Sequence, residues 1–150
     1  MTELNKVAEV AVIYRPLRNP SAAPKVTSSR DSYHLFLEHW SEDTIYLFES
    51  FKVLLINRAQ RVIGIFTAST GGVNGTVVDP RLIFSVAIKA LASSIILAHN
   101  HPSGNLKPSS ADLKLTEKLT QAGKFLEIPV LDHLIISEEG YYSFADEGML

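Results

Sequence analysis

The sequence contains no cysteine. This absence excludes disulfide bonds, thiolate zinc sites and a cysteine nucleophile, and it allows a reducing compartment without proving one. The sequence also lacks any uncharged apolar run of about 18 residues, the length that a membrane span needs. Its N-terminal stretch does not resemble a signal peptide, because Glu9 interrupts the first apolar run. We therefore expect a cytoplasmic protein that does not associate with a membrane.

The charge of the chain is small overall but unevenly distributed. The 150 residues carry a net charge of −2, and 46% of them are hydrophobic, which is typical of one soluble domain with a single core. Residues 50–114 hold seven basic and two acidic side chains, whereas the segments on either side are acidic. A basic middle segment is compatible with binding phosphates or an acidic partner, but a solvated surface is the more common reason for such a pattern.

Hydrophobic periodicity and turn residues predict alternating helices and strands. We expect helices packed against a mixed sheet in one α/β or α+β domain. A glycine-rich loop over 70–78 has no phosphate-binding signature. The expected strands are 6–14, 44–56, 61–69, 93–99, 128–137 and a closing strand within 138–144, and the expected helices are 29–40, 80–91 and 110–122, the last ended by Gly123.

Two histidines stand where the most apolar predicted strand ends. His99 and His101 are two residues apart, so in an extended segment their side chains point to the same face, while Asn100 points to the other. Asp112 falls in the first turn of the next helix, from which its carboxylate can return toward the histidines. Two imidazoles and one carboxylate are the three protein ligands of a catalytic zinc that leaves its fourth position to water. The pattern therefore predicts a metal site.

A hydrolytic metal site also needs a base and an oxyanion donor. Ser109, at the N-cap of the same helix, is positioned to hydrogen-bond the attacking water or the tetrahedral intermediate. Glu49 lies among apolar residues of a predicted strand, where a charge is costly unless it has a partner.

These residues resemble a known signature. The order is His99, Asn100, His101, seven intervening residues, Ser109, two intervening residues and Asp112, and it resembles the JAMM motif of the JAB/MPN metalloproteases, H-x-H-x(7)-S-x-x-D. Residues 45–150 resemble the RadC-like branch of that superfamily. The segments that carry this second resemblance are "HNHPSGNLKPS", "DPRLIF", "VLDHLIIS" and "YYSF".

The resemblance implies a fold, a metal and roles for particular residues. It implies a cytidine-deaminase-like fold, one zinc ion per chain held by His99, His101 and Asp112, Ser109 beside the bound water, and Glu49 as general acid and base. The implied activity is that of a zinc-dependent hydrolase of the metallopeptidase type, in which metal-activated water attacks a peptide or isopeptide bond of an unidentified peptide or protein substrate. We expect residues 1–44 to form an N-terminal strand, a proline-rich connection and a short helix of the same domain.

Two departures limit what the resemblance implies. Deubiquitinating members of the superfamily usually have Ser or Thr between the histidines, where this chain has Asn100, so isopeptidase activity on ubiquitin is not inferred. RadC-like proteins often carry an N-terminal helix-hairpin-helix segment, and residues 1–44 contain no such hairpin, which weakens the traditional association with DNA repair.

Other interpretations of the same residues stay open. Ser109 and Asp112 also fit an ordinary capping box, and His133 fits a core or supporting histidine better than a ligand. A DNA-associated module, such as a repair or mobile-element accessory or a metal-dependent nuclease, is one alternative function. A non-catalytic metal-binding scaffold is another. The sequence does not predict the oligomeric state.

Overall fold

A computed structural model describes residues 6–71 and 77–150. The described elements follow the chain in the order η2 (Pro20–Ala22), α1 (Ser29–Glu38), β1 (Ser50–Ile56), β2 (Val62–Thr70), α2 (Pro80–Lys89), β3 (Ser94–Asn100), α3 (Ser110–Phe125), β4 (Val130–Ser137) and β5 (Gly140–Ser143). Most of the expected glycine-rich loop lies outside the described residues. None of the described helices combines the length and apolar character that a membrane span requires.

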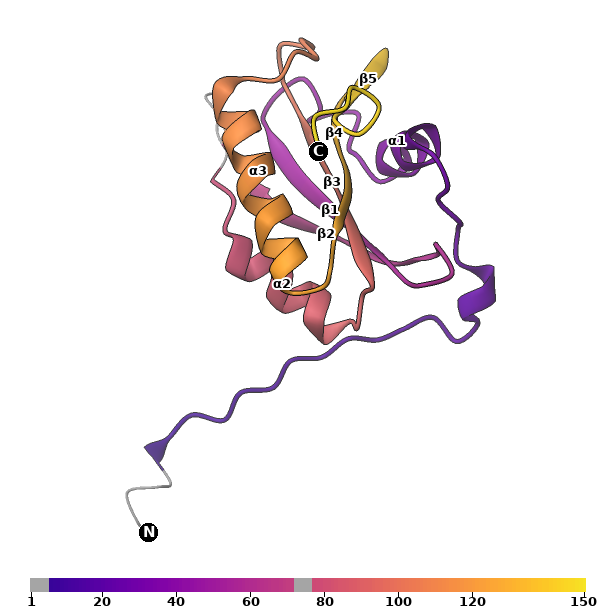
Figure 1. The fold of residues 1–150 in the computed structure, drawn as a ribbon, viewed down its shortest axis with the longest axis vertical. Coiled ribbons are helices and arrows are strands. Elements are labelled where there is room, and N and C mark those ends of the chain that lie inside the picture. Colours follow the sequence, from indigo (N-terminus) through magenta and orange to yellow (C-terminus); the bar gives the residue numbers. More distant parts are fainter. Residues whose placement is uncertain (1–5, 72–76) are drawn as a thin grey trace.

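The strands form one mixed sheet in the order β2-β1-β3-β4-β5. Only β3 and β4 pair in parallel, and α3 is the crossover that connects them. Helices α2 and α3 cover one face of the sheet and α1 covers the other, so the expected sandwich of helices around a mixed sheet is confirmed (Figure 1).

The alternation of side chains along the buried strands builds two cores. In β3, Ile95 and Leu97 face the helices α2 and α3, whereas Ile96 and Ala98 face α1. This alternation continues to the end of the strand, so His99 lies on the α3 side of the sheet and Asn100 on the α1 side. All seven residues of β3 are buried, which fixes the register of the strand from which the histidines emerge.

The sequence-based boundaries of β1 and α3 were wrong. The first hairpin strand begins at Ser50, because the Asn100 amide binds the carbonyl oxygens of Ile45 and Phe48 and holds the preceding segment in a turn. Helix α3 continues past Gly123 to Phe125. An added Cβ at Gly123 would lie 2.5 Å from the Ile128 carbonyl oxygen, so this glycine permits close packing and does not end the helix.

The expected strand over 6–14 is also wrong. The segment is extended but pairs with no described strand, and it leads away from the domain (Figure 1). Its pattern of alternating apolar residues is typical of a strand, but a strand needs a neighbour to satisfy its backbone groups, and none lies beside it here.

Candidate metal centre

The end of β3 and the start of α3 bring the predicted ligands together. One ligand atom from each of His99, His101, Asp112 and Glu49 lies within 4.8 Å of the other three. The His99 Nε2 atom lies 3.1 Å from the His101 Nε2 atom and 3.1 Å from Asp112 Oδ1, and His101 Nε2 lies 3.0 Å from Asp112 Oδ2. The four ligand-bearing side chains are largely buried, with His99 only 2% exposed.

Local structure places each of these side chains. His99 is held by the buried register of β3, directly opposite Phe51 of β1, whose ring stacks against the imidazole. His101 follows the strand, and its Nδ1–H donates to the backbone carbonyl of Asn105 at 2.6 Å. Asp112 belongs to a capping box. Ser109 Oγ accepts from the Asp112 backbone N–H, and Asp112 Oδ2 accepts from the Ser109 backbone N–H.

A chain of hydrogen bonds runs through Thr116 and His133 to the Nδ1 atom of His99. The Thr116 hydroxyl donates to the Asp112 carbonyl oxygen at 2.7 Å, so its lone pair accepts from His133 Nδ1 at 2.6 Å. His133 Nε2, 2.8 Å from His99 Nδ1, is then the acceptor for the His99 Nδ1–H. His133 is fully buried, and burial lowers its pKa well below the usual range, which keeps it neutral as this chain requires.

These hydrogen bonds fix which nitrogen of each imidazole is unprotonated. Both His99 and His101 carry their proton on Nδ1, so in the neutral rings both Nε2 lone pairs point at each other and at the Asp112 carboxylate. Three electron-pair donors about 3 Å apart repel one another unless a cation or a proton lies between them. In a tetrahedral zinc site, nitrogen ligands at about 2.0–2.1 Å from the ion are about 3.3 Å apart, so the donor set and its spacing fit zinc.

The titration behaviour of the metal-free cluster has the same cause. The hydrogen bond to Asp112 raises the pKa of His101, because the carboxylate favours the imidazolium form. Burial alone raises the pKa of Asp112, but hydrogen bonds from His101 and His99 outweigh it and hold that pKa far below its usual range. Without a metal, a proton shared at this position is what balances the negative charge of Asp112.

Glu49 and Ser109 flank the cluster in different ways. Glu49, just before β1, places Oε1 3.9 Å from His99 Nε2, next to the three donors. Ser109 is exposed, and its hydroxyl is the N-cap of α3. The structure thus shows the capping role of Ser109 directly, whereas its role beside a reacting water stays a prediction.

Sequence reasoning did not identify Thr116 or the clamp made by Asn100. Thr116 lies one helical turn after Asp112, a spacing that puts both on one face of α3, and this was a usable signal. Asn100 accepts from the Ser50 backbone N–H and donates to two carbonyls of the segment before Glu49, so it fixes the position of Glu49 relative to the histidines. Of the other histidines, His34 and His39 lie on α1 or at its end, outside the cluster.

Comparison with known proteins gives one family. The model of the RadC-like JAB domain matches residues 26–149. A UPF0758 protein of Flavobacterium johnsoniae is 45% identical over 125 residues, which are 83% of this chain and 53% of that protein. A UPF0758 protein of Porphyromonas gingivalis is 48% identical over 129 residues, 83% of this chain and 54% of the relative. The chain therefore spans about half the length of these relatives.

Proposed function

The chain belongs to the RadC-like JAB domain family, and on this basis we propose that it is a zinc-dependent hydrolase of the metallopeptidase type. The observation that supports the proposal is the convergence of His99 Nε2, His101 Nε2 and the Asp112 carboxylate, with a second carboxylate, Glu49, beside them. We further propose one zinc ion per chain, a peptide or protein substrate and a cytoplasmic location.

The roles of the residues follow from their positions. Zinc held by His99, His101 and Asp112 would supply Lewis-acid polarisation of an amide carbonyl and a lowered pKa for water. Glu49 takes the proton of the attacking water on a carboxylate oxygen and passes it to the leaving amine. The Ser109 hydroxyl, whose lone pair accepts from Asp112, keeps its own proton free to donate to a developing oxyanion.

The test separates metal binding from hydrolysis. Purified zinc-loaded protein is incubated with a mixture of proteome-derived peptides, and new peptide termini are counted by mass spectrometry. Glu49→Gln keeps the three proposed ligands and the shape of the side chain, so it should retain zinc and lose at least about 100-fold in cleavage rate, the typical contribution of a general base. His34→Ala, on the surface of α1, is the control and should cleave as the unmodified protein does.

Three results contradict the proposal. Equal cleavage by Glu49→Gln and the unmodified protein would show that Glu49 is not the base. Zinc without any cleavage would favour the non-catalytic scaffold. Cleavage of duplex DNA in place of peptides, with binding that falls steeply as salt rises, would favour the DNA-associated module.

A further inference from the structure

The N-terminal arm, residues 7–14, exposes a set of large apolar side chains. Val7, Val10, Val12 and Ile13 are each between 56% and 83% exposed. Among the described residues, no hydrogen bond joins the backbone of residues 8–13 to another segment. A globular chain rarely leaves alternating β-branched residues in solvent, because about 25 cal/mol is lost for every Å² of apolar surface that stays exposed.

Part of the sheet edge nearest this arm has no partner among the described residues. β2 is an outer strand, and the part of its backbone from Gly64 to Ala68 pairs with β1 and with no other described segment. Soluble proteins usually protect such an edge with charge, proline or a covering loop. The sequence of β2, "VIGIFTAST", has neither a charged residue nor a proline.

The apolar side chains of β2 are also incompletely covered. Ile63, Ile65 and Phe66 pack against the two cores but remain only partly buried. An apolar cavity of about 310 Å³ adjoins this edge. Its lining includes Leu17, Pro24, Leu35, Leu54 and Ile65.

Among the described residues, Tyr14 joins the arm to this edge. The Tyr14 hydroxyl donates to the Ile63 carbonyl oxygen at 2.6 Å, which fixes the C-terminal end of the arm beside the start of β2. From Tyr14 toward its N-terminus the arm leaves the domain instead of continuing along β2 (Figure 1). The arm also lies outside residues 26–149, the part that matches the family model.

We propose that two copies of this chain form a dimer by exchanging their arms, each arm adding a strand to the β2 edge of the other copy. Every chain carries both the donor strand and the acceptor edge, so reciprocal exchange closes with two-fold symmetry and leaves neither edge open. Main-chain hydrogen bonds supply the pairing, and the valines of the arm cover the half-buried side chains of β2. The proposal is independent of the hydrolase activity.

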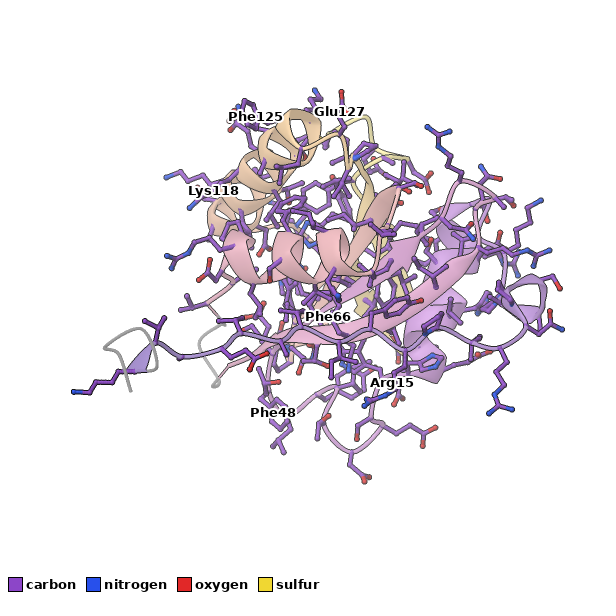
Figure 2. All side chains as sticks on the ribbon, turned by 90° about the horizontal axis from the view of Figure 1, so that it is seen from below. Arg15, Phe48, Phe66, Lys118, Phe125 and Glu127 are labelled. Atoms are coloured by element: carbon purple, nitrogen blue, oxygen red, sulfur yellow. The ribbon has the colours of Figure 1, made fainter. Side chains whose placement is uncertain are left out.

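The first test is the mass of the full chain in solution. Sedimentation velocity over a wide concentration range should show a dimer. Val10→Asp combined with Val12→Asp places two charges in the exchanged strand and should weaken the dimer by more than about 100-fold, because two buried valines are lost. The matched control is Gln121→Asp with Phe125→Asp, which adds the same charges on α3 and should remain dimeric. Figure 2 shows Phe125 on the side of the domain away from Arg15.

The second test locates the contact. Since the chain has no cysteine, Val10→Cys and Thr67→Cys each introduce a unique thiol. A bismaleimide reagent applied to a mixture of the two single variants should give a product of twice the mass, and each variant alone should give much less. A monomeric unmodified protein would overturn the proposal. So would a Val10→Cys/Thr67→Cys double variant that forms an intramolecular crosslink without dimers, because the arm would then pair with its own β2.

Discussion

The metal centre and the N-terminal arm both reverse the usual distribution of polar and apolar groups. In the metal centre, two imidazoles and two carboxylates are largely removed from water. In the arm, apolar side chains such as Val10, which is 83% exposed, extend into water. Either arrangement is costly for an isolated chain, and this cost is the reason that we propose a cation for the first region and a second polypeptide for the second.

The two regions differ in how firmly the rest of the chain holds their side chains in position. The ligands of the metal centre are fixed by a buried strand, a capping box and the hydrogen-bond chain through Thr116 and His133. Among the described residues, the arm is held at Tyr14, through one hydrogen bond and through packing of that side chain against the core. Substitutions at the metal centre should therefore disturb binding strongly, and substitutions in the arm should leave the domain nearly unchanged.

The largest effect is expected from removing a ligand. His101→Ala deletes one of the three donor atoms, so zinc affinity should fall by more than the roughly 100-fold that is typical for supporting residues. The measurement is zinc content after dialysis, followed by competition with a chelator. His34→Ala removes an imidazole from the surface of α1 and should keep about one zinc ion per chain. Equal zinc content in the two variants would show that the cluster is not the binding site.

A smaller loss of zinc affinity is expected when a residue that supports a ligand is replaced. Thr116→Val keeps the branched shape of the side chain but removes the hydroxyl that accepts from His133. Since the tautomer of His99 depends on that contact, zinc affinity should fall by about 10- to 100-fold. Thr120→Val is the matched control one turn later in α3, because among the described residues its hydroxyl has no hydrogen-bond partner. An equal change in both variants would mean that the hydrogen-bond chain does not position His99.

The dependence of stability on pH should differ between the metal-free and the zinc-loaded protein. The pKa of His101 is raised by Asp112, so its contribution to the stability of the metal-free fold is complete below the pKa of an unfolded histidine and is lost as pH rises through the raised value. The pKa of Asp112 is lowered, so its contribution is lost only as pH falls below the range of an unfolded aspartate.

Zinc binding should show the opposite trend with pH. Zinc competes with the proton on His101, so the stabilisation by zinc should grow with pH and level off above the raised pKa. Urea unfolding between about pH 5 and pH 9, with zinc and with a chelator, measures both curves. Above about pH 7, where His133 is neutral in both the folded and the unfolded chain, we expect the metal-free protein to lose less than about 1 kcal/mol as pH rises, because the site is partly open to water. A metal-free protein that gains stability as pH rises above about 7 would contradict the assignment.

The difference between the regions also explains what could be predicted from the sequence. The cluster of His99, His101 and Asp112 was predictable because its geometry is local: side chains alternate along a strand, and a cap returns the first turn of a helix toward the chain before it. The mixed sheet and its covering helices followed from periodicity in the same way. Non-local contacts were not predictable. The Asn100 clamp and the packing of Gly123 against Ile128 depend on segments distant in sequence or on the exact path of a turn.

The arm shows the limit of pattern-based prediction most directly. Residues 6–14 have the composition of a strand, yet composition alone does not say which edge such a strand will pair with, or in which chain. Among the described residues the arm pairs with no strand and leads away from the domain, and the proposed pairing between copies would reconcile the strand pattern with that observation.

The smallest effect is therefore expected from the arm itself. Val12→Ser removes an exposed apolar side chain that contributes nothing to the two cores, so in dilute solution, where the proposed dimer dissociates, the free energy of unfolding should change by less than about 0.5 kcal/mol. Zinc affinity should not change. Urea unfolding at low and high protein concentration measures the first quantity, and the unmodified protein should gain stability with concentration more steeply than Val12→Ser does. A large loss of unfolding free energy in dilute solution would mean that the arm packs on its own domain. The arm would then be a fixed part of the fold, as the metal centre is, and the comparison between the two regions would not hold.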